Sequence, residues 1–141
     1  MIRDFQTHDI DTVMKIWLET NTTAHDFIEN GYWHSNFDAV KKMLPNATIF
    51  VYEHNGSVRG FIGLMDSYIA GIFICNELQS KGIGKQLLNY VKYKYNELTL
   101  QVYKKNKRAV QFYLREGFTI SKEQMDENTD EIEFVMNWSK L

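Results

Sequence analysis

The seven residues from Gln79 to Lys85 combine two glycines with two lysines. They follow an apolar run that ends at Cys75, and an apolar-periodic segment begins within them at Ile83. This order predicts a strand, a glycine turn and a helix. The first turn of a helix offers free backbone N–H groups and the positive end of the helix dipole, and glycine lets the backbone close around a phosphate. The stretch therefore predicts a pyrophosphate-binding turn, to which Lys81 and Lys85 add positive charge.

Two familiar phosphate motifs do not fit this turn. A dinucleotide fingerprint needs a third glycine where Leu87 stands, and it belongs to the first strand–helix turn rather than to mid-chain. A Walker loop needs Gly-Lys-Ser or Gly-Lys-Thr, which is missing here. The spacing thus argues against a nicotinamide oxidoreductase.

A second motif lies downstream, where residues 106–118 read Asn-Lys-Arg-Ala-Val-Gln-Phe-Tyr-Leu-Arg-Glu-Gly-Phe. This segment resembles the N-x-x-A-x-x-[FL]-Y-x-x-x-G-F pattern of GCN5-related N-acetyltransferases, and Gln79-x-x-Gly82-x-Gly84 resembles the acyl-CoA loop of the same family. The resemblance covers roughly residues 49–118. At the N-terminus, Ile16-Trp17 and residues 24–27 are similar to the small bacterial YjaB-like group.

The resemblance implies an acetyl-CoA-dependent N-acetyltransferase without a metal. The implied fold is a single GNAT-like domain over residues 1–141, a mixed α/β architecture whose central, mostly antiparallel sheet is flanked by helices. Backbone groups of Ile72, Phe73 and Ile74 would pair with the pantetheine amides as a strand partner does. The implied coenzyme-binding residues are Ile72, Phe73, Ile74, Gln79, Ser80, Lys81, Gly82, Ile83, Gly84, Lys85, Asn106 and Tyr113.

Asn106 and Tyr113 are seven residues apart, about two helical turns, so their side chains share one stripe of the predicted helix. The resemblance places Asn106 beside the coenzyme arm near the thioester, and Asn also serves well as a helix N-cap. It places Tyr113 near the sulfur. Coenzyme A leaves as a thiolate when an amine attacks the thioester, and a tyrosine hydroxyl can protonate it or donate a hydrogen bond to it. Tyr113 is therefore the predicted general acid.

The base that would deprotonate the acceptor amine is less well defined. Some relatives carry a glutamate where this chain has Gln101, and an amide is not a base. Imidazole titrates near neutrality, and His25 lies in the N-terminal region that frames acceptor sites in the family, so His25 is the predicted substitute. Asp66 and Glu77, acting through water, are further candidates. Cys75 as a nucleophile has no histidine partner placed by sequence.

The remaining chain supplies elements that would position these residues. Asn55-Gly56 between two apolar runs predicts a tight hairpin over residues 47–65. The apolar spacing from Asp9 predicts a helix with Asp9 as its N-cap, and Pro45 ends another around residues 39–44. Residues 25–33 fit no clear pattern. The predicted order is one strand, two helices, three strands, a helix, a strand, a helix and two strands.

Composition restricts the class of protein. With 141 residues, 44% of them hydrophobic, the chain suits one domain with a packed core. A net charge of −2 argues against a general nucleic-acid binder and weakly favours a cationic acceptor. The sequence has no signal-peptide pattern and no apolar run long enough to span a bilayer, which favours a cytoplasmic protein that binds neither nucleic acid nor membrane.

Three points stay open at the level of the sequence: the oligomeric state, the acceptor, and whether the protein is catalytic. Family members often pair through their C-terminal strands, which makes a homodimer one of the possible arrangements. The resemblance implies that the acceptor is a primary amine of a small molecule, peptide or protein, and that it attacks directly in a ternary complex. The alternative function is a non-catalytic acyl-CoA-binding sensor, which Gln101 permits and Tyr113 opposes.

Overall fold

The computed structural model describes residues 1–140 and contains a seven-stranded sheet in the order β1-β2-β3-β4-β5-β7-β6. The strands are β1 (Ile2–Asp4), β2 (Thr48–His54), β3 (Ser57–Met65), β4 (Tyr68–Ile74), β5 (Glu97–Tyr103), β6 (Thr119–Asp126) and β7 (Glu131–Ser139). The helices are α1 (Ile10–Ala24), α2 (Asn30–Met43), α3 (Ile83–Lys94) and α4 (Lys107–Arg115). Short 3-10 turns lie at Thr7–Asp9, Leu44–Asn46 and Asn76–Leu78.

The centre of the sheet is a short parallel contact between β4 and β5, and the remaining neighbours are antiparallel. The parallel pair is limited to Tyr68 opposite Thr99 and Ile69 opposite Leu100. Beyond Ile69, β4 continues to pair with β3 while β5 pairs with β7. The two strands therefore part, and the backbone groups of β4 on the β5 side are left without a strand partner.

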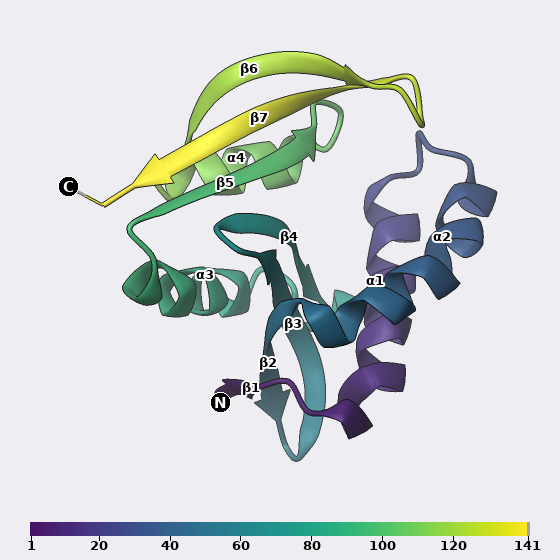
Figure 1. The fold of residues 1–141 in the computed structure, drawn as a ribbon, viewed down its shortest axis with the longest axis vertical. Coiled ribbons are helices and arrows are strands. Elements are labelled where there is room, and N and C mark those ends of the chain that lie inside the picture. The colour runs from purple at the N-terminus through teal and green to yellow at the C-terminus, as the bar shows by residue number, and fades with distance from the viewer. Residues whose placement is uncertain (141) are drawn as a thin grey trace.

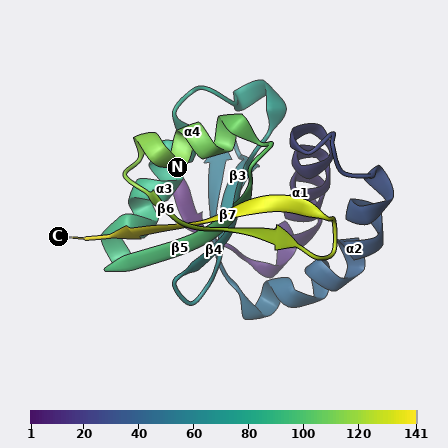
Figure 2. The ribbon, with the colours of Figure 1, turned by 90° about the horizontal axis from the view of Figure 1, so that it is seen from above.

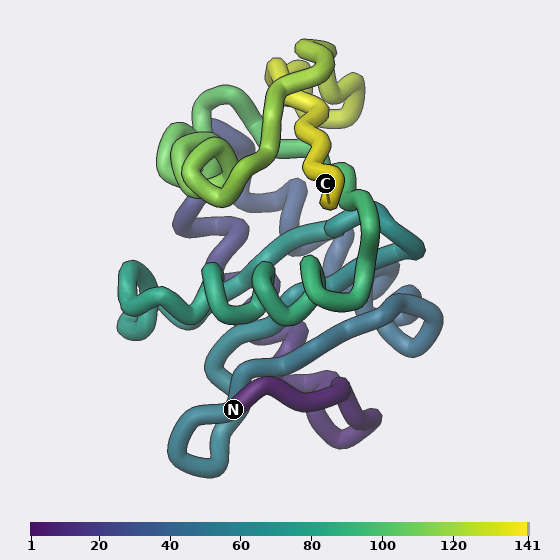
Figure 3. Tube along the Cα trace, turned by 90° about the vertical axis from the view of Figure 1, so that its left-hand side faces the viewer, coloured from purple at the N-terminus to yellow at the C-terminus, as the bar shows by residue number. Residues whose placement is uncertain are grey.

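Each face of the sheet carries its own apolar core. Alternating side chains of β2 show this, since Phe50 joins the cluster under α3 and α4 while Ile49 and Val51 join the cluster under α1 and α2. Figures 1 and 2 show α1 and α2 together at one side of the molecule and α3 at the other, with strands between them. In Figure 3, α3 crosses in front of β2–β4, and the yellow-green β6–β7 hairpin lies above it.

The observed order confirms the mixed α/β, mostly antiparallel architecture predicted from the sequence. α2 begins at Asn30, inside the undecided stretch 25–33, and so starts well before the helix predicted around residues 39–44. Its N-cap residue, Glu29, makes no side-chain capping bond, and Gly31 stands at the second helical position. A helix without a capping bond and with an early glycine lacks the usual start signals, so the sequence pattern did not indicate where α2 begins.

Asp9 is the N-cap residue of α1, as predicted, but its side chain does not cap the helix, since its backbone is helical and it makes no side-chain capping bond. Its carboxylate instead accepts bonds from Arg3 at 2.9 and 3.0 Å and from the Gln6 N–H at 2.8 Å. Asp9 is 4% exposed, and the Arg3 guanidinium holds the pKa of this carboxyl below its usual range. The residue thus fixes β1 against the start of α1.

Candidate active site

A cavity of about 750 Å³ opens where β4 leaves β5, within the size range of small-molecule sites. It is bounded by the end of α1, β4, the glycine turn and one side of α4. Of the predicted residues, the cavity lining includes His25, Ile72, Phe73, Ile74, Gln79, Ser80, Gly82, Ile83, Gly84, Lys85, Asn106 and Tyr113. Lys81 is exposed and lies outside this lining. Residues from four separate elements thus meet at one site.

The glycine turn presents an uncapped helix end to this cavity. Gly82 is the N-cap of α3 with a φ of +83°, a left-handed conformation that favours glycine. It has no side chain to cap the helix, and the first turn of α3 contains no acidic residue. The first N–H groups of α3 have no intrahelical acceptor. This end of α3 therefore has the features of an anion site, with Lys85 one turn away.

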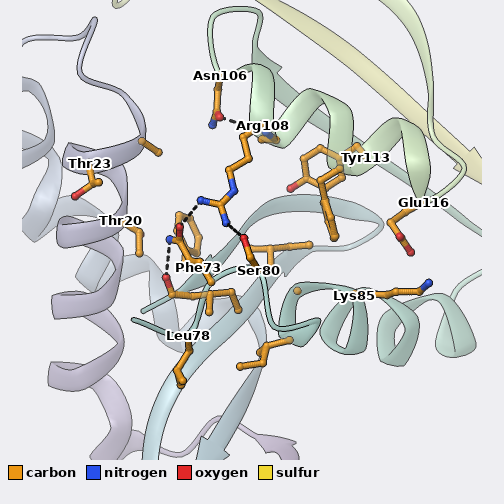
Figure 4. Close-up of a pocket in the computed structure, with 18 of the residues that line it drawn as sticks. Thr20, Thr23, Phe73, Leu78, Ser80, Lys85, Asn106, Arg108, Tyr113 and Glu116 are labelled. Carbon is orange, nitrogen blue, oxygen red and sulfur yellow. Dashed lines mark hydrogen bonds between the residues drawn. The ribbon is translucent and has the colours of Figure 1, made fainter. Parts of the chain in front are cut away.

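Arg108 joins the glycine turn to α4 and was missed by sequence reasoning. Its guanidinium donates to Gln79 Oε1 at 2.8 Å and to Ser80 Oγ, as Figure 4 shows. Gln79 in turn donates through Nε2 to the Ile74 carbonyl at 3.0 Å. A basic residue two positions after Asn106 was the available signal, but only the fold brings it against the turn. Arg108 places a second positive group at the predicted phosphate site.

Tyr113 lies on the inner side of α4, 7% exposed, with its ring edge-on to Phe112 and Phe118. Within residues 1–140 its hydroxyl has no hydrogen-bond partner, and Figure 4 shows it directed into the cavity. Burial raises the pKa of Tyr113 above its usual range, with a smaller contribution from Tyr68. The hydroxyl is thus a protonated donor throughout the neutral range, as the predicted acid role requires.

Asn106 and His25 are in direct contact, although 81 residues separate them in the chain. The Asn106 side-chain oxygen accepts from the Ala109 N–H at 3.3 Å, which confirms the predicted N-cap. The same contact directs the Asn106 amide nitrogen toward His25 Nε2, 3.2 Å away. That nitrogen must donate, so His25 Nε2 accepts and the ring proton lies on Nδ1. The geometry therefore assigns a neutral imidazole in a defined tautomer.

The surroundings of His25 favour the same neutral state. Its ring stacks on Trp33 with centroids 5.2 Å apart and meets Tyr103 edge-on at the same distance. Burial lowers the pKa of His25 to about 4, against a smaller opposing effect of the Asn21 backbone. His25 Nδ1 is buried without a hydrogen-bond partner among the described residues. An imidazole in this state orients Asn106, and its basicity is low for a proton acceptor.

The other candidates lie outside the cavity lining. Cys75 packs into the apolar cluster under α1 and α2, Glu77 pairs with Arg59 at 2.9 Å, and Asp66 is exposed in the β3–β4 turn. Residues 1–140 contain no group of three or more His, Cys, Asp or Glu side chains arranged to hold a metal ion. In the same range, no helix is both long enough and apolar enough to cross a membrane.

Comparison with known proteins agrees with the fold and the cavity. The family described as "Acetyltransferase (GNAT) domain" matches residues 16–136. The chain is 34% identical over 140 residues to the peptidyl-lysine N-acetyltransferase YiaC of Escherichia coli, covering 98% of this chain and 96% of YiaC. It is 27% identical over 121 residues to the peptidyl-lysine N-acetyltransferase YjaB of the same organism, covering 85% and 82%. The solution structure of apo YjaB superimposes with a TM-score of 0.86 at 24% identity over 98% of this chain and 96% of that one.

The fold and the family match together define an N-acetyltransferase. The chain belongs to the GNAT family, within its YjaB-like group, and is an acetyl-CoA-dependent N-acetyltransferase. The family assignment made from the two sequence motifs is thereby confirmed.

Proposed function

We propose that this enzyme transfers the acetyl group of acetyl-CoA to the side-chain amine of a lysine in a peptide or protein. The observation that carries the proposal is the cavity, which brings an uncapped helix end, an unpaired strand edge and a buried tyrosine hydroxyl to one groove. The acceptor class is supported by the names of YiaC and YjaB, which are peptidyl-lysine N-acetyltransferases. A small-molecule amine is the second candidate acceptor.

The groove suits coenzyme A part by part. The N–H groups at the start of α3 would bind the pyrophosphate, with Arg108 and Lys85 supplying positive charge. The backbone of β4 between Gly71 and Ile74 has no strand partner on its β5 side, although the Ile74 carbonyl accepts from Gln79, and would bind the pantetheine amides. A backbone N–H of the same strand would stabilise the oxyanion that forms when the thioester is attacked. The first N–H groups of α3 have no intrahelical acceptor, and the Arg108 guanidinium, which donates to Gln79 and Ser80, adds its charge beside them.

Tyr113 is the proposed donor to the leaving sulfur. Its pKa is raised above the usual value of about 10, whereas a thiol has a pKa of about 8.5. Full proton transfer from this phenol to the thiolate is therefore uphill. The hydroxyl contributes chiefly by donating a hydrogen bond to sulfur as negative charge develops there, and the proton follows as the product leaves.

Direct attack by the amine within a ternary complex fits the arrangement better than a covalent acetyl-enzyme. The chain's one cysteine, Cys75, lies in the cluster under α1 and α2 rather than along the cavity. The sequence proposes His25 as the proton acceptor. Its low pKa and the donation of the Asn106 amide to its Nε2 favour a positioning role instead, in which His25 fixes the amide beside the thioester.

The experiment combines acetyl-CoA with a lysine peptide and follows thiol release and the mass of the peptide. The proposal predicts one added acetyl group on the lysine and initial-rate lines that intersect when both substrates are varied. Parallel lines would contradict direct attack. Acetyl-CoA binding without turnover on any amine would instead favour the non-catalytic sensor.

A further inference from the structure

Glu133 on β7 is a buried carboxylate without a cation. It is 8% exposed and receives one hydrogen bond, from Gln124 Nε2 to its Oε2 at 2.7 Å. The comparable buried carboxylate, Asp9, pairs with Arg3, whereas Glu133 forms no ion pair with any residue in the 1–140 range. Burying a charge without a counter-ion is costly, and one neutral amide compensates for little of that cost. Glu133 is therefore a candidate to bind a cationic group of another molecule.

The sheet register places Glu133 on the side of β5 that faces away from α3 and α4. Glu133 is directly opposite Tyr103 on β5, and Gln101 lies two residues back on the same face. The alternate residues Leu100 and Val102 enter the core under α4. Glu133 thus shares its face with the position at which some relatives carry a glutamate. The carboxylate is present in this chain, but on the neighbouring strand.

Tyr68 connects this face with the proposed thioester position. Its hydroxyl is 3.4 Å from Gln101 Oε1. Burial raises the pKa of Tyr68, and the negative charges of Glu133 and then Asp126 raise it further. Tyr68 in turn contributes to the raised pKa of Tyr113. Through Gln101 on β5, Tyr68 on β4 is linked to the face that carries Glu133 on β7.

The other charged groups near this face are already engaged or negative. Asp126 accepts a hydrogen bond from the Tyr103 hydroxyl at 2.7 Å, and Lys105 pairs with Glu131 at 3.1 Å. Burial raises the pKa of Tyr32 on α2, and the charges of Asp126 and Glu133 add to this effect. The carboxylates of Glu133 and Asp126 thus lie on or beside a face that carries the Tyr68 and Tyr103 side chains. Such a surface attracts a primary ammonium group.

We propose that Glu133 binds the ammonium group of the acceptor, on the face of the sheet that it shares with Tyr103 and Gln101. This inference rests on the acetyl-transfer proposal for its biological meaning but is tested by binding alone. It assigns the acceptor side of the site to the β5–β7–β6 face, opposite α4. It also defines the substrate chemically, since an ammonium at the end of an apolar side chain would be preferred over a neutral side chain of similar length.

The test is calorimetric titration of two peptides into enzyme saturated with coenzyme A. The peptides are identical except for a lysine in one and a norleucine in the other. Glu133→Gln retains the size of the side chain and an acceptor for Gln124 while removing the charge. We expect the lysine peptide to bind at least tenfold more weakly to Glu133→Gln, and the norleucine peptide and acetyl-CoA to bind as they do to the wild type.

The matched control is Glu123→Gln on β6. Glu123 is exposed, pairs with Lys104 at 3.3 Å and lies on the other face, opposite Phe134. The same loss of charge there should leave both peptide affinities within twofold. If Glu133→Gln fails to fold, Glu133→Asp replaces it, and we expect that variant to retain the preference for lysine over norleucine.

Three results would overturn the proposal. The first is a lysine-peptide affinity of Glu133→Gln within twofold of the wild type, and the second is equal weakening of both peptides. The third is a wild-type enzyme that does not distinguish lysine from norleucine. If lysine binding depends on Glu133 but no acetylated peptide forms, the acetyl-transfer proposal fails and the ammonium site stands.

Discussion

At the scale of single residues, the chemistry depends on hydroxyl and imidazole groups whose protonation states the fold sets. Tyr113 is kept protonated by burial, and His25 is kept neutral by burial and by its contact with Asn106. Neither state follows from the sequence. The tyrosine was identified by its place in a motif, whereas the tautomer of His25 required knowing that Asn106 caps α4.

Replacing Tyr113 by phenylalanine tests the donor role. The ring would still pack against Phe112 and Phe118, so the free energy of unfolding should change little. Loss of the hydrogen bond to developing thiolate should lower kcat by about 10²-fold. Stopped-assay kinetics and acetyl-CoA titration measure the two effects separately. An unchanged kcat would remove Tyr113 from the chemistry, and a large loss of acetyl-CoA affinity would indicate a binding role instead.

The low pKa of His25 predicts a particular response to acid. In the unfolded chain its pKa is about 6.5, and in the folded protein about 4. Between these values the unfolded state binds more protons, so the folded state loses stability as pH falls from about 6.5 to 4. Across this window the free energy of unfolding of His25→Asn should fall by about 2 kcal/mol less than that of the wild type. This value allows for partial exposure of the ring.

Denaturant unfolding at pH 7.5 and pH 4.5 measures this difference. Other titrating groups, including Asp9, contribute equally to both proteins and cancel in the comparison. An equal loss of stability in the two proteins on acidification would mean that His25 is not held neutral, and the assigned tautomer would then be wrong.

At the scale of elements, the glycine turn and α3 are the proposed phosphate site. Gly82→Asp adds negative charge there, and a Cβ at this position meets no other atom within 4 Å. We expect acetyl-CoA affinity to fall at least tenfold, because the added carboxylate would repel the pyrophosphate and occupy the free N–H groups.

Gly56→Asp is the matched control for this change. Gly56 lies in the β2–β3 turn with a φ of +80°, and its Cβ position is equally open. Both variants pay a similar cost for placing a side chain at positive φ, so their loss of stability should be similar. Equal acetyl-CoA affinity in the two variants would show that the turn does not bind the coenzyme.

Most elements were predictable because their signals are local. The Asn55-Gly56 turn fixed the hairpin, and the spacing of Ile83, Leu87 and Val91 fixed α3. Residues 25–33 were unresolved because α2 starts without a capping bond. Asp9 stands at the predicted N-cap position, but its carboxylate pairs with Arg3 instead of making a capping bond. Long-range partners are the part of the fold that local patterns do not contain.

At the scale of the whole molecule, the parting of β4 from β5 connects fold and function. Figure 1 shows the sheet dividing beside the start of α3, with α4 on one side and the α1–α2 pair on the other. The groove proposed to bind acetyl-CoA lies along β4 and α4. The proposed ammonium site lies on the face of β5 that is turned away from α3 and α4. Two substrates would thus approach one point from opposite faces of a single sheet.

The candidate site was predictable only in part at this scale. Motif residues from β4, the glycine turn and α4 were identified because the family pattern places them together. Arg108, Tyr68 and Glu133 were missed, since each gains its significance from a residue on another element. Glu133 in particular is one of many acidic residues in sequence, and only its burial without a cation distinguishes it.

The central claim is that the groove between β4 and α4 binds acetyl-CoA, and calorimetric titration tests it most directly. Acetyl-CoA and NAD would each be titrated into the wild-type enzyme, since both carry a pyrophosphate and only one carries a pantetheine arm. We predict saturable binding of acetyl-CoA with one site per chain and no binding of NAD under the same conditions. Absence of acetyl-CoA binding, or equal binding of NAD, would contradict the assignment of the groove.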